Sequence, residues 1–550
     1  MAFSPHPEPA HDCALPLGAP APGTDRRMLC VFPRYAPSFG TFHHSFKLVG
    51  ARAFFPPQGI LLIAAFFAAR GWTVRIVDEN LRALTEADLA WARVVMVSGM
   101  HVQRDKILDI ASRAHRHRLA VVLGGPSVSA APNWYPEVDM LHIGELGDAT
   151  EALGERLEHD LKRPAAQEIY RTMDRTPLED FPTPAYHLAD TGGYLVGTVQ
   201  SSSGCPFKCE FCDIPELYGR KPRLKTPQQI TTELDAMLAN GIRDAVYFVD
   251  DNFIANPHAA KRLVEHLVTW QQQHRYPVDF TCEATLNITQ HPDLLALMRQ
   301  ARFTQLYAGI ETPEEDALVA MDKRHNLRSP LLEAIAAINS YGIEVASGVI
   351  LGLDTDTPDT YDRFCRFIDA SHIPFLTINL LQALPHTPLR RRLQAEGRVL
   401  ATPRPGDSNV RFLLPRETVV NGWRHVIAHA YQPDRMFARY LYQMHNTHPH
   451  RLPVPLSSPR YRPTALPRGA RIIANVLWHC GIRAPYRTAF WRMATTALLR
   501  HRNPEGMLWA AVAGHHLTTF TNEALEDRTE KTFYADTMPD PAPLPPVSND

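Results

Sequence analysis

The sequence predicts an α/β protein in which two sets of strand–helix repeats precede a helical extension. Short apolar runs alternate with helix-period patterns over residues 25–160, and the same alternation returns over residues 191–395. Glycine or acidic residues stand where many of these apolar runs end. From 396 to 530 the pattern is mainly helical. Alternating strands and helices indicate parallel sheets, which bind ligands at the carboxyl ends of their strands.

Length and composition narrow the classes of protein. At 550 residues the chain exceeds a single hydrophobic core, and its net charge of −1 argues against a general nucleic-acid binder. The longest apolar run, 59–69, is about half of what a membrane span needs. Eight cysteines, three of them in one motif, form no disulfide pattern, so we expect a reducing cytoplasm. The ends of the chain, 1–24 and 531–550, are expected to be disordered.

Residues 25–160 predict a doubly wound parallel sheet. Five apolar runs predict its strands: residues 28–32, 73–77, 94–97, 120–123 and 140–143. Mostly small residues follow three of these strands, where they would let the backbone approach a ligand: Ser98, Gly99, Gly124, Gly125, Gly144 and Glu145. The glycines would equally suit plain turns between strands and helices. A polar, proline-punctuated connector over 161–190 is expected to follow this domain.

Three cysteines stand close together in the loop 204–213. Cys205, Cys209 and Cys212 have the spacing CxxxCxxC, and three thiolates so near one another will hold a metal. A structural zinc site takes four protein ligands, and no partner pair of cysteines or histidines is found elsewhere in the sequence. An iron–sulfur cube held by three cysteines leaves one iron open to a substrate or cofactor. A zinc site remains the alternative.

The cysteine loop belongs to the second set of repeats, residues 191–395. Six runs predict its strands: residues 194–200, 245–249, 279–282, 305–308, 344–347 and 375–378. Helical patterns separate them, several with proline in the first turn. Six such units predict a partial (β/α)6 barrel whose active face lies at the carboxyl ends of the strands. Asp250, Asp251 and Asn252 follow the second strand, where they suit either a helix cap or a site.

The cysteine spacing and the six repeats together resemble the radical SAM superfamily. The resemblance implies a 4Fe-4S cluster that binds S-adenosylmethionine (SAM) at its open iron and cleaves it to a 5′-deoxyadenosyl radical. Phe211 matches an aromatic near the SAM adenine. Segments after two later strands match regions that bind polar groups of SAM or lie beside the adenine: Gly309, Glu311, Gly348 and Gly352. Glu283 could act as Glu311 does, and packing is the alternative role for both carboxylates and the glycines.

The N-terminal domain resembles the cobalamin-binding domain that precedes many radical SAM cores. Four steps carry the resemblance: Pro56–Gly59, Ser98–Gly99, Gly124–Pro126 and Gly144–Glu145. It implies that the nucleotide tail of cobalamin runs among these loops and that the ring faces the next domain. The motif D-x-H-x-x-G, which elsewhere supplies a histidine to cobalt, is absent after the first strand, where Pro33–Ala36 stands. A bound cobalamin would therefore have no motif histidine below the metal.

Residues 396–530 predict a helical domain with helices near 416–430, 433–444, 468–480, 486–501 and 504–518. The stretch 468–502 combines arginines with Trp478, Phe490 and Trp491 at helical spacing. Such a face suits a membrane surface, an anionic substrate or the solvated side of a packed helix. The order of the domains resembles that of the cobalamin-dependent radical SAM methylases, which include the hopanoid and bacteriochlorophyll side-chain methylases. The sequence segments Cys209–Ile214 and Leu217–Pro222 carry the resemblance most sharply.

That resemblance implies a radical C-methyltransferase for a small, apolar or natural-product substrate. The deoxyadenosyl radical would take hydrogen from an unactivated carbon, and methylcobalamin, renewed by a second SAM, would supply the methyl group. A flavodoxin or ferredoxin is the expected reducing partner. Two alternatives stay open: a cobalamin-dependent rearrangement or cyclisation without methyl transfer, and a methylthiotransferase. The second fits less well, because such enzymes place three more cysteines in the N-terminal domain and only Cys13 and Cys30 precede the core here.

Overall fold

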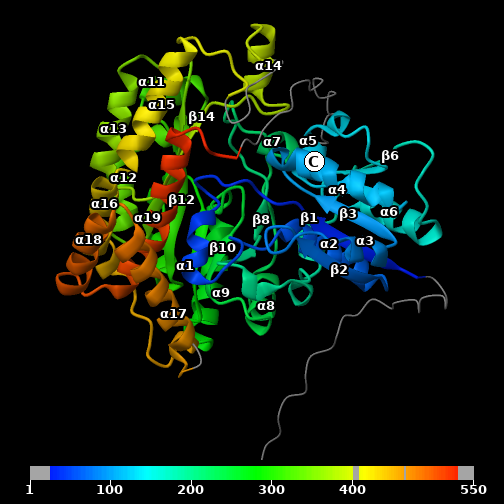
Figure 1. Ribbon diagram of the computed structural model, residues 1–550, viewed down its shortest axis with the longest axis horizontal. Helices are drawn as coiled ribbons and strands as arrows, with labels where there is room; N and C mark the ends of the chain where they lie inside the picture. Colours follow the sequence, from blue (N-terminus) through cyan, green and yellow to red (C-terminus); the bar gives the residue numbers. More distant parts are fainter. Residues whose placement is uncertain (1–24, 401–407, 464–465, 531–550) are drawn as a thin grey trace, which may run out of the picture.

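A computed structural model describes residues 25–400, 408–463 and 466–530. Its two larger sheets are parallel and six-stranded, and a third sheet is a short antiparallel pair. Figure 1 shows the N-terminal sheet at the right, with the barrel and the C-terminal helices at the left. The α/β class predicted from the sequence is confirmed. The segments expected to be disordered, 1–24 and 531–550, lie outside the described residues.

The N-terminal sheet has the strand order β2-β1-β3-β4-β5-β6. Its strands are β1 (Arg27–Phe32), β2 (Thr73–Asp78), β3 (Val94–Ser98), β4 (Ala120–Gly124), β5 (Met140–Ile143) and β6 (Glu168–Arg171). The sequence predicts the first five. β6 falls inside the stretch expected to be a connector, and it pairs in parallel with β5 from Met140 opposite Glu168. The sheet therefore reaches further along the chain than the apolar pattern indicates.

Helices cover both faces of this sheet, as a doubly wound fold requires. They are α2 (Gln58–Ala69), α3 (Glu86–Trp91), α4 (Arg104–Arg116), α5 (Pro126–Ala130) and α6 (Asp148–His159). Strand β1 supplies both cores, because alternate side chains point to opposite faces. Leu29 and Val31 pack with α3, α4 and α5, whereas Met28, Cys30 and Phe32 pack with α2 and α6. Burial on both faces explains why these strands are continuous apolar runs.

A short segment between β1 and α2 leaves the N-terminal sheet and packs against the other end of the chain. Helix α1 (Phe46–Val49) and the turn before it lie beside the C-terminal helices (Figure 1). Ser45 donates a hydrogen bond to the carbonyl of Val512 at 2.7 Å, and His44 Nε2 lies 2.9 Å from Glu523. Phe39 and Phe42 join the core of the barrel and the C-terminal helices. The sequence pattern does not predict this crossing.

The barrel sheet has the strand order β14-β13-β12-β11-β10-β7, all parallel. Its strands are β7 (Gly197–Val199), β10 (Asp244–Phe248), β11 (Val278–Glu283), β12 (Phe303–Glu311), β13 (Glu344–Leu351) and β14 (Leu376–Leu380). The helices on its outer side are α8 (Pro227–Ala239), α9 (Pro257–Gln273), α10 (Pro292–Gln300), α11 (Glu315–Ala320), α12 (Leu331–Asn339) and α13 (Thr360–Ser371). The sequence predicts all six strand–helix units. They form the open, partial barrel expected.

The cysteine loop is an insertion between β7 and α8. A two-stranded ribbon closes its base, because β8 (Ser202–Ser203) pairs in antiparallel fashion with β9 (Arg223–Leu224). Helix α7 (Ile214–Leu217) follows the last cysteine of the motif. Thr226 then begins α8 with a capping box, in which its hydroxyl accepts from the backbone of Gln229. The loop is thus held between two regular elements rather than left open.

The C-terminal domain is helical, as the sequence predicts. After α14 (Pro388–Ala395) it contains α15 (Arg416–Ala430), α16 (Pro433–Asn446), α17 (Leu466–Val476), α18 (Arg487–Leu499) and α19 (Pro504–Leu525). A π-helical turn, Leu477–Arg483, joins α17 to α18. Helix α19 is buried along most of its length, between α16, α18 and the crossing segment at Phe39 and Phe42. Within the described ranges, no helix is both long enough and apolar enough to cross a bilayer.

Candidate active site

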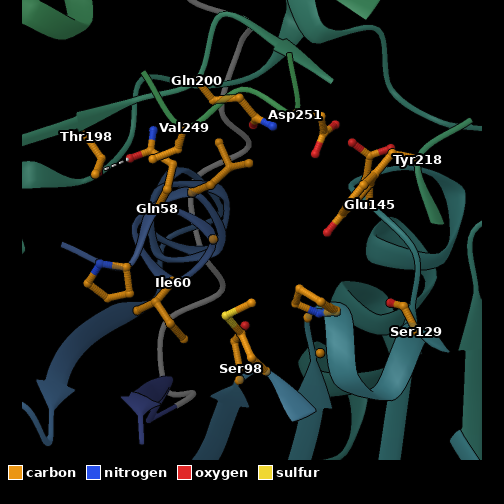
Figure 2. Close-up of a pocket in the computed structure, with 18 of the residues that line it drawn as sticks. Gln58, Ile60, Ser98, Ser129, Glu145, Thr198, Gln200, Tyr218, Val249 and Asp251 are labelled. Carbon is orange, nitrogen blue, oxygen red and sulfur yellow. Dashed lines mark hydrogen bonds between the residues drawn. The ribbon is translucent and has the colours of Figure 1, made fainter. Parts of the chain in front are cut away.

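The carboxyl ends of both parallel sheets open into one cavity. Its volume is about 720 Å³, which falls in the usual range for ligand pockets. The N-terminal sheet contributes the ends of β3, β4 and β5, and the barrel contributes the ends of β7, β10, β11 and β12. Figure 2 shows Ile60 and Ser98 on one side of this space and Gln200 and Asp251 on the other. The cavity therefore belongs to two domains.

All six residues singled out in the N-terminal domain line the cavity. They are Ser98, Gly99, Gly124, Gly125, Gly144 and Glu145. Two of the glycines have backbone angles that other residues rarely adopt, with φ of 93° at Gly125 and 105° at Gly144. A Cβ at Gly125 would lie 2.5 Å from the hydroxyl of Ser98. The bare backbone at this edge matches the needs of a large cofactor that lies against the loops.

Histidine is scarce around this part of the cavity. His142 is the one histidine among the described residues that line it. Its Nε2 is 2.8 Å from the hydroxyl of Thr150, and burial lowers its pKa to about 4. The side chain is therefore a neutral, hydrogen-bonded part of the domain core.

Two adjacent aspartates at the end of β10 hold the cysteine loop. Asp250 accepts hydrogen bonds from the backbone N–H groups of Ser201 at 2.6 Å and Ser202 at 2.8 Å, and from the Ser201 hydroxyl. Asp251 accepts from the backbone of Gly204 at 2.7 Å. Burial raises the pKa of Asp250 to about 6 and that of Asp251 to about 7. Neither carboxylate caps a helix, and both instead fix the backbone that leads into the cysteine loop.

Cys209 is buried, Cys205 and Cys212 are half-buried, and the thiols of the three residues influence one another electrostatically. Burial raises the pKa of all three thiols, and the charge of Asp213, followed by those of Cys209 and Cys205, raises that of Cys212 further. Within residues 25–400, 408–463 and 466–530, no group of three or more histidine, cysteine or acidic side chains is already arranged to hold a metal ion. Thiol is nevertheless the donor that iron–sulfur clusters use. A bound cation would favour the thiolates, because it offsets the cost of burying their charge.

A buried lysine lies beside the cysteines. Lys323 donates to Glu311 at 2.7 Å, and its ammonium is 5.5 Å from the centre of the Phe211 ring. Burial lowers the pKa of Lys323, but Glu311 and the nearby thiols Cys209 and Cys212 raise it overall, so the ammonium stays charged. Lys323 is thus a fixed positive charge close to the place where cluster and SAM would meet. Nothing in the sequence pattern points to it.

The residues predicted to contact SAM fall into two groups. Gly309 and Glu311 line the cavity, and Glu311 has a left-handed backbone with φ of 66°. Phe211, Gly348 and Gly352 are not among the residues that line it. Phe211 packs against two small apolar clusters that include Leu389 and Leu318.

The two glycines beside β13 pack closely. A Cβ at Gly348 would lie 2.7 Å from the hydroxyl of Tyr307, and one at Gly352 would lie 2.5 Å from Phe412. Gly352 also has φ of 88°. Both positions therefore require glycine for packing, whatever they contact. Glu283, a further acidic candidate, lines the cavity and accepts a hydrogen bond from Tyr247.

Glu145 connects the two domains across the site. Its carboxylate accepts from the Ser203 hydroxyl at 2.9 Å and from Arg223, and it lies 3.5 Å from Arg175. Ser203 and Arg223 face each other across the ribbon at the base of the cysteine loop. This residue therefore joins the N-terminal sheet to the loop, besides lining the cavity. The sequence indicates its position at a strand end but gives no sign of its partners.

Several polar residues that line the cavity are not among the site residues that the sequence predicts. Gln58, Gln200, Tyr218, Tyr247 and Tyr307 all present polar atoms there. The Gln58 amide accepts from Thr198 at 3.2 Å, which joins the start of α2 to the first barrel strand (Figure 2). Gln200 directly follows β7, so its place at a strand end was a usable signal. The tyrosines carry no such signal, because Tyr247 and Tyr307 stand within strands β10 and β12, and Tyr218 follows helix α7.

Three family models match successive parts of the chain. A B12 binding domain matches residues 48–154, and the Radical SAM superfamily matches residues 199–368. A domain of unknown function, DUF4070, matches residues 387–530. The first two matches cover the two domains whose strand ends form the cavity.

Curated relatives match almost the whole chain. Hopanoid C-2 methylase of Rhodopseudomonas palustris (strain TIE-1) is 52% identical over 93% of this chain and 97% of its own length. An uncharacterized methyltransferase of Synechocystis sp. is 34% identical over 90% of both chains. Bacteriochlorophyllide d C-12(1)-methyltransferase of Chlorobaculum tepidum is 23% identical over 60% of this chain and 72% of its own.

Solved structures support the same arrangement of the fold. The cobalamin-dependent SAM radical enzyme OxsB, with aqua-cobalamin and SAM bound, superposes with a TM-score of 0.59 at 13% identity, over 91% of this chain and 80% of that one. The radical SAM methyltransferase TsrM of Kitasatospora setae, with cobalamin and a [4Fe-4S] cluster bound, gives 0.53 at 13% identity, over 82% of this chain and 99% of that one. The shared cavity, the two domain matches and the near full-length relatives agree. The chain belongs to the cobalamin-dependent radical SAM methylases, which methylate an unactivated carbon with a 4Fe-4S cluster, SAM and cobalamin.

Proposed function

We propose that this enzyme methylates an apolar polycyclic lipid of the hopanoid type. The observation that carries the proposal is that the cysteine loop and the glycine-ended sheet open into a single cavity with largely apolar walls. The apolar walls include Phe55, Ile60, Ile63, Val122 and Phe181. The relative named hopanoid C-2 methylase, 52% identical over nearly its whole length, supports this substrate class.

Each cofactor has a matching set of residues in this proposal. Cys205, Cys209 and Cys212 would hold the cluster, and Gly309 and Glu311 would meet SAM at the end of β12. The loops at Ser98–Gly99, Gly124–Gly125 and Gly144–Glu145 would lie against cobalamin. When bound, the cluster and SAM supply a radical that removes hydrogen from carbon, and cobalamin supplies the methyl group.

The chain's own residues position these groups and shape the cavity between them. Asp250 and Asp251 fix the backbone just before Cys205, so the first cysteine enters from a defined direction. Glu145 fixes the same loop from the cobalamin-binding side. Lys323 places a positive charge beside the cysteines and binds one oxygen of Glu311. Holding reactants in fixed geometry is the main way a protein accelerates such a step.

The electron donor is proposed to be a flavodoxin or ferredoxin. Exposed basic residues surround the cysteine loop: Lys208, Arg220, Lys221 and Arg324. Such a patch complements the acidic surface of a small electron carrier and would speed its encounter. Lys208→Glu combined with Lys221→Glu should raise the KM for flavodoxin but leave activity with dithionite unchanged. An equal effect with both reductants would exclude this docking site.

Anaerobic reconstitution tests the proposed function directly. We expect the purified protein to bind iron, sulfide and cobalamin, to form 5′-deoxyadenosine from SAM, and to convert a hopanoid to a product one methyl group heavier. Cys205→Ala should lose the cluster and all product but keep cobalamin, whereas Cys365→Ala, at a buried cysteine remote from the motif, should keep both. Deoxyadenosine formation without a methylated hopanoid would retain the enzyme class and overturn the substrate.

Contact with a membrane surface is a separate proposal, since it rests on residues 466–500 rather than on the cavity.

A further inference from the structure

The helices α17 and α18 and the π-helical turn between them form an outer surface of the C-terminal domain. We call residues 466–500 the α17–α18 surface. Figure 1 shows these helices at the lower left of the molecule, away from the N-terminal sheet. Only one side chain of α17, that of Val476, is buried. Asn475 holds the inner side of the helix by donating to the carbonyls of Lys47 and Leu48.

Large apolar side chains are concentrated on this surface. Of the seventeen large hydrophobic side chains that are exposed in the described residues, eight lie here: Leu466, Ile473, Leu477, Trp478, Ile482, Trp491, Leu498 and Leu499. Leu499 is 81% exposed, Leu466 70% and Ile482 58%. Leu466 and Ile473 share one side of α17, opposite Asn475, by the helical period, and Leu477 follows at the start of the π-helical turn. A soluble monomer rarely gathers so many exposed apolar groups without a partner.

The charges on the same surface are all positive. Residues 466–500 contain six arginines and no aspartate, glutamate or lysine. Arg468 and Arg492 pair with acidic residues outside the surface, Asp244 and Asp434. The other four are Arg471, Arg483, Arg487 and Arg500, and none of them pairs with a described carboxylate. A chain with net charge −1 thus carries an unbalanced positive patch around apolar side chains.

A shallow groove on this surface has the composition of a headgroup site. Arg487, Thr488, Trp491, Arg492 and Thr495 line it, and Gly481 forms part of its floor. Trp491 Nε1 donates to the carbonyl of Gly481 at 2.9 Å, which fixes the indole across the turn. Guanidinium and hydroxyl groups bind phosphate, and a tryptophan beside them suits the boundary between headgroups and acyl chains.

We propose that the α17–α18 surface docks on an anionic lipid bilayer without crossing it. Leu466, Ile473, Trp478, Ile482 and Leu499 enter the boundary region, and the arginines bind the phosphates of the lipids. Charge complementarity selects a bilayer over a second copy of the chain, since two such faces would repel each other. An amphipathic helix lying in the plane of the interface has this combination of an apolar stripe and flanking cations.

The docking deepens the proposed function, because an apolar polycyclic substrate would reside in the bilayer. It does not require that substrate, since the surface is built from residues outside the cavity. The two proposals therefore fail separately. Loss of vesicle binding leaves methylation of a detergent-dispersed substrate intact, and a different substrate leaves vesicle binding intact.

Cosedimentation of the full-length protein with vesicles tests the docking. We expect binding to vesicles of phosphatidylcholine with phosphatidylglycerol, weak binding to phosphatidylcholine alone, and weaker binding as salt rises. The triple variant Arg471→Gln, Arg483→Gln, Arg487→Gln should bind the anionic vesicles on the order of a hundredfold more weakly. The matched control, Arg116→Gln, Arg262→Gln, Arg366→Gln, removes three exposed arginines elsewhere and should bind as the wild type does.

An apolar variant separates insertion from simple charge attraction. Trp478→Ser with Ile482→Ser should lose binding that persists at high salt, whereas Ile169→Ser with Leu413→Ser, at exposed positions elsewhere, should not. Cobalamin content, measured in every variant, shows that each one is folded. The proposal is overturned if the wild type does not bind anionic vesicles, or if the variants of the α17–α18 surface bind them as strongly as the wild type does. If the wild type instead self-associates without binding lipid, and only the variants of the α17–α18 surface lose this self-association, the surface is a dimer interface.

Discussion

Removing the carboxylate of Asp250 should release the base of the cysteine loop. The side chain is 1% exposed and accepts from two backbone N–H groups and one hydroxyl, all at Ser201 and Ser202. Asp250→Ala leaves these donors buried without a partner, at a cost of about 1–3 kcal/mol for each group. Part of the cost is recovered, because a carboxyl group whose pKa burial raises to about 6 no longer has to be buried. We expect a net loss of about 3 kcal/mol, concentrated in the loop.

The assay for this loss combines cluster content with hydrogen exchange. After anaerobic reconstitution, Asp250→Ala should hold clearly less iron per chain than the wild type, and the amides of Ser201 to Cys212 should exchange faster. Asp250→Asn should lie between the two, because its carbonyl oxygen still accepts from the backbone. Glu333→Ala, at an exposed helical position, is the control and should change neither measurement.

The prediction for Asp250→Ala assumes that the hydrogen bonds from Ser201 and Ser202 to Asp250 connect the cysteine loop to β10. If Asp250→Ala holds as much iron as the wild type and shows unchanged exchange at Ser201 and Ser202, these bonds do not position the loop. An Asp250→Ala chain that loses cobalamin as well as iron would indicate general unfolding instead. Cobalamin retained while iron is lost is the outcome that supports the reasoning.

Three further predictions follow from other parts of the site and core. Gly125→Ala should reduce bound cobalamin, seen in the visible spectrum, because its Cβ would meet the Ser98 hydroxyl; Gly469→Ala, with open space around it, should not. Lys323→Met should lower the free energy of unfolding by about 3 kcal/mol, since it leaves Glu311 buried and unpaired, and adding Glu311→Gln should restore most of it in thermal unfolding. Burial lowers the pKa of His516 to about 3, against about 6.5 unfolded, so only the unfolded chain takes up this proton as pH falls below 6.5. Stability should therefore fall with pH, by up to about 1.4 kcal/mol per unit from this group, and the slope between pH 7 and pH 5 should be smaller in His516→Gln.

The sequence alone predicts most strands of both sheets. Strands such as β3 and β4 are continuous apolar runs, because parallel strands are buried on both faces. Strand β6 is not predicted in this way. It is a polar edge strand, Glu168–Arg171, that packs little apolar surface and depends on backbone pairing with β5. A connector and an edge strand look alike in sequence when neither needs an apolar pattern.

The sequence likewise predicts only part of the candidate site. The cysteine spacing, the glycines and the acidic residues after the strands are visible in sequence, because each follows a strand end and strand ends meet at one edge of a sheet. Their partners are not visible. Glu145 with Arg223, Glu311 with Lys323, and Asp250 with Ser201 are brought together by chain folding over separations that no local pattern encodes.

What the sequence determines by itself is thus the set of elements and the chemistry at their ends: two parallel sheets, a three-cysteine loop and a helical extension. What only the tertiary structure decides is that both sheets turn their carboxyl edges toward one cavity, and that Phe39–Val49 crosses to the C-terminal helices. The physical reason is that periodicity reports whether a residue is buried, not what buries it. The two cofactor sites become one active site through packing between domains.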